Sequence, residues 1–191
     1  MIVSHRHRFV FVKTRKTAGS SIEAALFPFL GPNDICTGSE RDGTPRRNCL
    51  EGTSGHLDWS TISDMAPVDG YYWCAFERNP WDKTISDWLF KRDISGTFSD
   101  GLCDFIEKGA PVDWPKYTDG DRPVFDVFRY EELQTSFAAV MQSIGLPLTR
   151  LDLHLKRHPD RKPYREYFDA ETRMLVARCF ASEIAHFGYE F

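Results

Sequence analysis

The stretch Phe9–Leu26, FVFVKTRKTAGSSIEAAL, constrains the fold most, because it joins an apolar run to a polar loop and then to a helical pattern. The run FVFV is β-branched and aromatic throughout, which predicts a central parallel strand covered on both faces. Gly19 gives the loop conformational freedom. Ser20 or Ser21 is a suitable N-cap for a helix whose apolar face begins at Ile22. The stretch therefore predicts a strand, a loop and a helix in direct succession.

The loop between this strand and helix is rich in groups that bind anions. The start of a helix leaves backbone N–H groups unpaired and carries a partial positive charge. A lysine and several hydroxyl groups add donors at the same place. The sequence therefore predicts a phosphate or sulfate cradle, with an ordinary turn and a solvated lysine as the simpler alternative. The residues assigned to the cradle are Lys16, Thr17, Ala18, Gly19, Ser20 and Ser21.

The order of residues in the loop distinguishes two classes of nucleotide-binding protein. A P-loop nucleoside triphosphatase needs a glycine five residues before its Gly-Lys pair, and no glycine precedes Lys16. The sequence KTAGSS instead resembles the 5′-phosphosulfate loop of sulfotransferases, in the PKTGGTS or PKTAGTS form of the carbohydrate sulfotransferase branch. Arg15 stands where that family usually has proline, so a second cation lies beside Lys16.

A second strand-to-helix turn follows at YYWCAFERNPWDKTIS. The run YYWCAF predicts a strand, Asn79 is a good N-cap, and Pro80 suits the first helical position. Arg78 then lies at the carboxyl edge of the strand, where open α/β sheets bind ligands. Ser86 lies about two turns into the helix. We therefore expect Arg78 and Ser86 to bind one anion together.

The segment RNPWDKTIS is similar to RNPYDRLVS, the 3′-phosphate motif of sulfotransferases, in which seven residues separate the arginine from the serine. The resemblance implies that Arg78 and Ser86 bind the 3′-phosphate of the donor. Glu77 occupies a position where the family usually has an apolar residue. It either pairs with a neighbouring cation or weakens the phosphate site.

His56 is the candidate general base. It lies at the end of Gly31 to Leu57, a stretch of low periodicity expected to form a surface loop, and precedes a short helix expected to start near Asp58. Histidine is the usual base at neutral pH, and the resembled branch often uses a histidine or glutamate after its first motif. Glu23 and Glu51 are the substitutes, and a surface or capping role for the histidine is the simpler alternative.

The segment from Arg150 to Arg165 is basic, with six Lys or Arg residues against two Asp. It is either a solvated loop or, as the resemblance implies, a loop that closes over the nucleotide. The candidate contacts are Arg157, Arg161, Lys162 and Arg165. One last helix is expected from near Asp169 to Gly188, where glycine ends it.

Composition limits the class of protein. A chain of 191 residues predicts a single domain spanning 1–191. No apolar run is long enough to cross a bilayer, and no cleavage site follows a sustained hydrophobic segment near the N-terminus. The five cysteines are scattered without a CxxC pair, which indicates a reducing, cytoplasmic location and no metal. A net charge of −4 argues against a general nucleic-acid binder, so the anion site must be local.

The resemblance implies a three-layer, P-loop-like α/β domain with a mainly parallel central sheet flanked by helices. It further implies a soluble bacterial-type enzyme, or a form trimmed of a membrane anchor, that uses 3′-phosphoadenosine-5′-phosphosulfate (PAPS) without a metal. The sulfuryl group would pass to a hydroxyl or amine of an acceptor, leaving adenosine 3′,5′-bisphosphate (PAP). Lys16 would stabilise the departing phosphate oxygen while the cradle holds the 5′-phosphate.

Two other functions remain open from the sequence. One is a P-loop kinase using ATP and magnesium, and the other is a nucleotide-binding regulator that transfers nothing. The acceptor is expected to be a small molecule or a glycan, with no nucleic-acid partner and no membrane segment in the chain. The variable stretches Gly31–Leu57 and Asp93–Arg122 would shape its site. Trp59, Trp114 and Tyr117 either stack on a sugar or pack back on the domain.

Overall fold

The computed structural model describes residues 1–38, 45–49, 55–65, 69–153, 155, 158 and 161–191. The chain divides into two compact units. Unit 1 comprises Met1–Glu77 and Pro115–Leu155, and unit 2 comprises Arg78–Trp114 and Lys156–Phe191. The single domain expected from the length of the chain stays a prediction.

Unit 1 is built on a six-stranded sheet with the order β4-β3-β1-β2-β5-β8. The two strands expected from the motifs are present. β2 consists of the FVFV run, and β5 contains most of the YYWCAF run. The bounds are β1 Ile2–Ser4, β2 Phe9–Val12, β3 Ile35–Thr37, β4 Arg46–Arg47, β5 Tyr72–Glu77 and β8 Asp126–Arg129. A separate two-stranded hairpin consists of β6 Thr118–Asp119 and β7 Arg122–Pro123.

The sheet is mixed, so the expectation of a mainly parallel sheet was wrong. β2 pairs in parallel with β5, and β5 with β8, whereas β1 pairs antiparallel with both β2 and β3, and β3 with β4. The reason lies in the N-terminal segment, where β1 joins β2 through a turn too short for a parallel crossover. β3 and β4 lie in the stretch expected to be only a surface loop, and they are too short to produce a periodic pattern.

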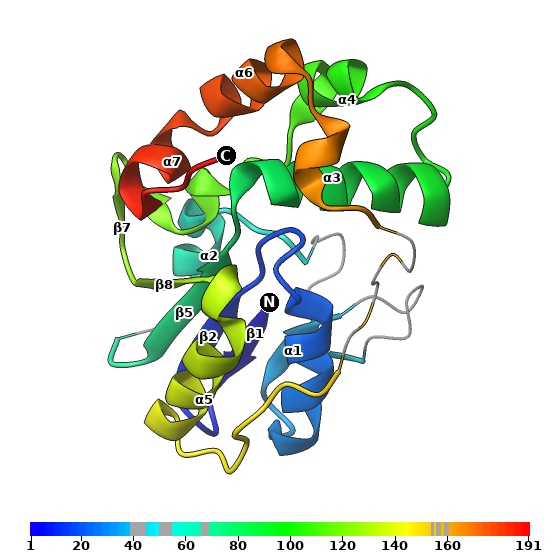
Figure 1. Ribbon diagram of the computed structural model, residues 1–191. Coiled ribbons are helices and arrows are strands. Elements are labelled where there is room, and N and C mark those ends of the chain that lie inside the picture. Colours follow the sequence, from blue (N-terminus) through cyan, green and yellow to red (C-terminus); the bar gives the residue numbers. More distant parts are fainter. Residues whose placement is uncertain (39–44, 50–54, 66–68, 154, 156–157, 159–160) are drawn as a thin grey trace. The chain divides into compact units, whose positions relative to one another are not determined.

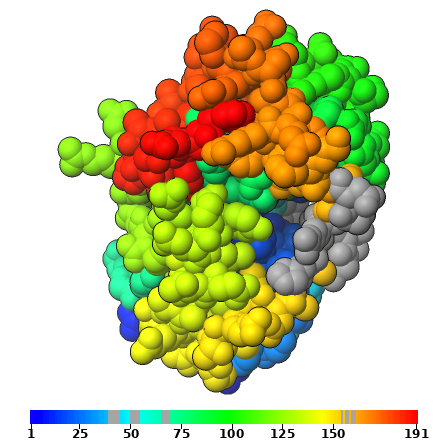
Figure 2. Space-filling model, viewed as in Figure 1, coloured from blue at the N-terminus to red at the C-terminus, as the bar shows by residue number. Residues whose placement is uncertain are grey.

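Side chains alternate between the two faces of this sheet, as strand geometry requires. Phe9 and Phe11 of β2 pack with helices α1 (Gly19–Leu26) and α5 (Leu133–Ser143). Val10 and Val12 belong to a second cluster that includes Ile62 of α2 (Trp59–Met65). Unit 1 thus has three layers, and α1 and α5 lie on the same side of the strands (Figure 1). Figure 2 looks onto this side, where α5 and the segment after it cover much of unit 1.

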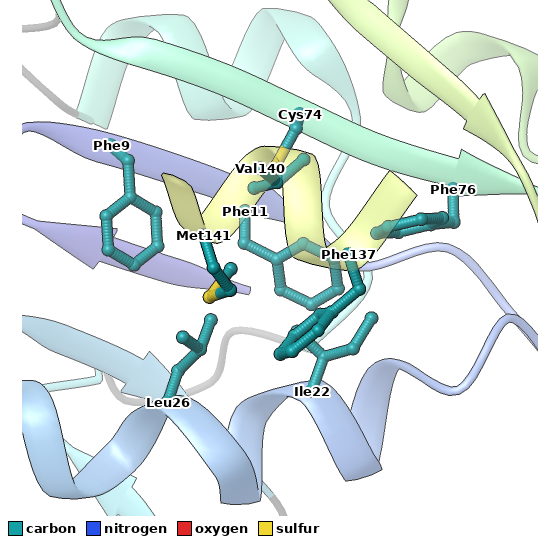
Figure 3. Close-up of a pocket in the computed structure, with 9 residues that line it drawn as sticks. All are labelled: Phe9, Phe11, Ile22, Leu26, Cys74, Phe76, Phe137, Val140 and Met141. Atoms are coloured by element: carbon teal, nitrogen blue, oxygen red, sulfur yellow. The ribbon is translucent and has the colours of Figure 1, made fainter. Parts of the chain in front are cut away.

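A small apolar cavity of about 10 Å³ lies between the sheet and these two helices. Apolar side chains from β2, β5, α1 and α5 surround it (Figure 3). This volume approximates the space of a single water molecule, and the lining offers such a water no polar partner. The cavity is therefore a packing gap in the core of unit 1. Its lining consists of Phe9, Phe11, Ile22, Leu26, Cys74, Phe76, Phe137, Val140 and Met141.

Unit 2 is helical and has its own core. Trp81, Ile85 and Leu89 of α3 (Pro80–Leu89) pack with Phe105 of α4 and Val176 of α6. The other elements of unit 2 are η3 Phe90–Ile94, α4 Leu102–Gly109, η6 Tyr164–Tyr167, α6 Ala170–Cys179 and α7 Ala181–Phe187. Short 3-10 turns elsewhere in the described chain are η1 Phe27–Phe29, η4 Trp114–Lys116 and η5 Tyr130–Glu132.

Local sequence signals explain where the helices of unit 2 begin and end. The side chain of Asn79 accepts hydrogen bonds from the backbone of Trp81 and Asp82, which confirms it as the N-cap of α3. Asp169 caps α6 in the same way. The expected single last helix is in fact two, because α6 ends at Cys179 and α7 begins at Ala181. Gly188 ends α7 in a left-handed conformation, with φ of 63°.

None of the helices in the part of the chain that the structure describes is both long enough and apolar enough to span a membrane.

Candidate active site

The loop from β2 to α1 has an unusual backbone. Lys16 and Ala18 both adopt left-handed conformations, with φ of 61° and 63°. Residues other than glycine rarely take this conformation, which costs about 1–3 kcal/mol and is concentrated at ligand sites. Left-handed residues in turns direct backbone N–H groups into concave anion-binding arrangements. The backbone therefore favours the predicted anion cradle over an ordinary turn.

Two threonines hold this loop in place, and only one of them is among the predicted site residues. Thr14 donates its hydroxyl proton to the carbonyl oxygen of Phe76 in β5. Its oxygen lies 2.8 Å from the hydroxyl of Thr17, which in turn donates to the carbonyl oxygen of Thr14 at 3.2 Å. Both side chains are buried. The hydroxyl of Thr17 thus forms hydrogen bonds within the loop. The backbone N–H of Thr17, rather than its hydroxyl, is therefore the group suited to bind a ligand.

The start of α1 differs from the expectation that Ser20 or Ser21 caps it. The N-cap is Ala18, which has no side-chain capping group, and the helix begins at Gly19. Both serines lie inside the first turn because the left-handed Ala18 ends the loop early. The hydroxyl oxygen of Ser21 accepts a hydrogen bond from the backbone of Leu155 at 3.0 Å. Because the side chain of alanine cannot accept hydrogen bonds from the first N–H groups of the helix, these groups are suited to bind an anion.

Glu23 is poorly suited to act as the substitute base. Its carboxylate is fully buried and lies 2.5 Å from both the Lys13 ammonium and the amino group of Met1. Burial alone would raise the pKa of Glu23, but these two cations outweigh it and lower the pKa. Glu51, the other substitute, lies outside the described residues.

His56 lies beside the first residue of the loop. Its Nδ1 is 2.9 Å from the carbonyl oxygen of Lys13. A carbonyl oxygen can only accept, so Nδ1 must carry the proton, and the lone pair of the neutral ring is on Nε2. This contact fixes the tautomer and the orientation of the ring, as a general base requires.

The second predicted motif, at the start of α3, forms a cluster around Asp82. Arg78 donates to Oδ2 of Asp82 from Nε at 2.7 Å, and its Nη2 lies 2.6 Å from the same oxygen. Arg161 donates from Nη2 to Oδ1 and, at 3.0 Å, to the backbone oxygen of Asp82. Ser86 lies one turn further along α3 and is half-buried. Unit 2 therefore brings Arg161, a candidate from the basic segment, to the carboxylate that also holds Arg78.

The other candidates of the basic segment do not join this cluster. Lys162 is exposed, and its backbone N–H donates to the hydroxyl of Tyr167 at 3.1 Å. Arg165 donates to the backbone oxygen of Phe191 at 2.8 Å. Arg157 lies outside the described residues.

Glu77 and the proposed stacking aromatics are packed into their units. Glu77 is fully buried and accepts a hydrogen bond from the hydroxyl of Tyr117 at 3.1 Å, and Tyr117 is itself fully buried. Trp59 packs against Trp73 in unit 1. In unit 2, Trp114 packs edge-on against His186. This packing favours the alternative in which these aromatic residues pack back on the domain.

Sequence reasoning missed Thr14, the Lys13–Glu23 pair and the role of Asp82. For Asp82 a signal was available, because an aspartate four residues after an arginine is well spaced to pair with it. Among the residues that the structure describes, no group of three or more His, Cys, Asp or Glu side chains is placed to hold a metal ion.

Comparisons with known proteins bear on the fold and the family. No family model matches the chain. A protein of Archaeoglobus fulgidus, described as uncharacterized, is 34% identical over 99 residues, which cover 48% of this chain and 82% of that protein. The crystal structure of mouse sulfotransferase SULT7A1 complexed with PAP matches with a TM-score of 0.56 and 15% identity. That match covers 95% of this chain and 85% of the mouse chain. At this level of identity, the likeness to the mouse enzyme concerns the fold.

Proposed function

We propose that the chain is a PAPS-dependent sulfotransferase, because it has the fold of a sulfotransferase. It belongs to the same family as the Archaeoglobus fulgidus protein, whose description as uncharacterized names no activity. The proposed enzyme would move a sulfuryl group from PAPS to a hydroxyl or amine of a small-molecule or glycan acceptor. The observation that carries this proposal is the β2–α1 loop, in which left-handed Lys16 and Ala18 lead into a helix start capped by alanine. The mouse sulfotransferase of similar fold is in complex with PAP, which supports the choice of nucleotide.

In this proposal the loop binds the 5′-phosphosulfate end of the donor. Backbone N–H groups from Thr17 to Ser21 hold the 5′-phosphate. Lys16 neutralises the charge that develops on the bridging phosphate oxygen as its bond to sulfur breaks. The new bond forms between that sulfur and the acceptor oxygen or nitrogen. His56 takes the acceptor proton on Nε2, because Nδ1 already donates to Lys13.

The 3′-phosphate is assigned to the start of α3. Arg78 and Ser86 are the proposed ligands, and the contact of Arg161 with Asp82 supports adding it to the set. Guanidinium groups bind phosphate through paired N–H donors, which suits this role. Lys162 remains a weaker candidate because it is exposed.

Calorimetric titration tests the donor site without knowledge of the acceptor. The expected result is metal-independent binding of PAP that is at least tenfold tighter than that of ATP with magnesium. Arg78→Ala should weaken PAP binding by at least tenfold. The matched control is Arg165→Ala, which removes an arginine bonded to Phe191 and should leave affinity within twofold. Preference for ATP with magnesium would favour the kinase alternative.

Transfer of ³⁵S from PAPS to a panel of phenols, sugars and amines separates an enzyme from a non-catalytic regulator. Lys16→Ala should abolish transfer while the variant keeps its fold by circular dichroism. A protein that binds PAP but labels no acceptor class would favour the regulator. Unchanged turnover in Lys16→Ala would refute the role of this lysine.

A further inference from the structure

The cluster at the start of α3 has a feature that phosphate binding alone does not explain. Asp82 uses both oxygens of its carboxylate on the two guanidinium groups that the proposed function assigns to the 3′-phosphate. Arg78 is on Oδ2, and Arg161 is on Oδ1 and on the backbone oxygen. The carboxylate thus occupies donors that a phosphate would use.

The charges of this cluster are shielded from solvent. The side chains of Arg78, Arg161 and Asp82 are 10%, 18% and 22% exposed. Burial is the main cause that lowers the pKa of Arg161, and the neighbouring charge of Arg78 lowers it further, while Asp82 raises it. The two guanidinium groups contact the same carboxylate and repel each other, and the negative charge of Asp82 offsets this repulsion. The three side chains together carry one net positive charge.

We propose that Asp82 is an internal competitor for the 3′-phosphate, and that it limits how tightly the site holds the donor and the product. This inference rests on the proposed function. A phosphate with up to two negative charges displaces a single carboxylate from the guanidinium groups. The displaced Asp82 then lies near the phosphate as a like charge, which weakens binding.

The competition has a consequence for selectivity and for turnover. A nucleotide without a 3′-phosphate does not disturb the Asp82 contacts, so it neither gains nor loses affinity from them.

Both PAPS and PAP carry the 3′-phosphate, so the site would otherwise hold the product as tightly as the donor. Product release often limits turnover in enzymes. Asp82 would therefore speed the release of PAP.

The test compares Asp82→Asn with the wild type for two ligands that differ only at the 3′ position, PAP and AMP. The variant keeps the shape of the side chain and removes its charge. The dissociation constant of PAP should fall at least fivefold, with most of the change in the dissociation rate measured by stopped flow. The affinity for AMP should stay within twofold.

The matched control is Asp87→Asn. This residue lies on the same helix and pairs with Lys91, with 3.0 Å between their charged atoms, so its loss should leave PAP binding unchanged. If Asp82→Asn does not fold, Asp82→Ser removes the same charge with a smaller side chain. PAP binding that is unchanged or weaker in a folded variant would overturn the inference, because Asp82 would then only position the arginines.

These outcomes separate the inference from the proposed function. Wild-type protein that binds PAP no more tightly than AMP would refute the 3′-phosphate site itself. Wild-type protein that prefers PAP, with an Asp82→Asn variant that binds PAP no more tightly, would refute only the competition by Asp82.

Discussion

The Lys13 ammonium lies 2.5 Å from Oε2 of Glu23, and both side chains are buried. This pair joins the end of β2 to α1, the two elements that flank the candidate anion loop. Lys13 also contacts the loop in two other ways. Its carbonyl oxygen faces Nδ1 of His56, and its side chain lies against Gly19. The position of this lysine therefore affects both the proposed base and the proposed cradle.

Gly19→Ala should disturb the cradle. A Cβ atom at this position would lie 2.7 Å from Cγ of Lys13, and the Lys13–Glu23 pair prevents that side chain from moving freely. We expect a loss of about 1–3 kcal/mol in the free energy of unfolding and at least tenfold weaker PAP binding, measured by urea titration and calorimetry. The control is Gly101→Ala, where the nearest atom would be 3.5 Å away. Equal effects of the two substitutions would contradict this prediction.

His56→Gln should reduce turnover by a factor of about 10² to 10⁴, the range for loss of a general base. Glutamine cannot accept the acceptor proton, but it leaves the donor site intact. PAP affinity should therefore stay within twofold by calorimetry, while kcat of ³⁵S transfer falls. His7→Gln is the control, since His7 contacts the backbone oxygen of Phe29 away from the loop. A kcat close to that of the wild type would exclude His56 as the base.

Asp34 should make the stability of unit 1 depend on acid pH. Its carboxylate accepts hydrogen bonds from the backbone of His5, Arg6 and Gly31 and from the hydroxyl of Ser4. Burial alone would raise the pKa of Asp34, but these hydrogen bonds outweigh it and lower the pKa below 3.8. The bonds therefore stabilise the fold fully above that pH, and the stabilisation is lost as the pH falls through the folded-state pKa.

Asp34→Asn tests this dependence. The difference in free energy of unfolding between wild type and variant should be constant from pH 7 to about pH 5 and should shrink below pH 4. Urea unfolding across this range measures it. Asp121→Asn, at an exposed position between β6 and β7, is the control and should give a small difference at every pH. If the difference in free energy of unfolding between the wild type and Asp34→Asn grew as the pH fell, the prediction would be contradicted.

Lys83→Met should strongly destabilise unit 2. Nζ of Lys83 lies 2.8 Å from Oδ2 of Asp113, and both side chains are fully buried. Removal of the lysine leaves a buried carboxylate without this cation, which costs about 3–5 kcal/mol. The double variant Lys83→Met/Asp113→Leu should recover most of the loss, as urea unfolding will show. The control Lys108→Met breaks an exposed ion pair with Asp100 and should leave the free energy of unfolding close to that of the wild type.

The sequence predicted the parts of the fold that depend on local patterns. The FVFV run, the Asn79 cap and Gly188 each act within a few residues. The structure confirms the cap and the helix end at Gly188, and it confirms FVFV as a buried inner strand that is parallel to β5 but antiparallel to β1. The strands β1, β3 and β4 were missed because each is too short to show a period. The break at Phe180 was missed because the apolar stripe continues through it.

The candidate site was also predictable only in the features that depend on local sequence. The loop position of Lys16 followed from residue order, but its left-handed backbone did not, because lysine has no intrinsic preference for it. Arg161 was one of several cations in a basic segment. Its contact with Asp82 joins residues 79 positions apart, and such a contact depends on tertiary packing.

The outermost strands of the described sheet carry charged side chains. β4 consists of Arg46 and Arg47, and β8 begins with the exposed Asp126 and ends with Arg129. Unpaired backbone groups at a sheet edge can recruit a strand from another molecule, and charged side chains at the edge oppose this. The short, charged borders of this sheet should therefore protect a concentrated solution of the protein from aggregation through strand addition.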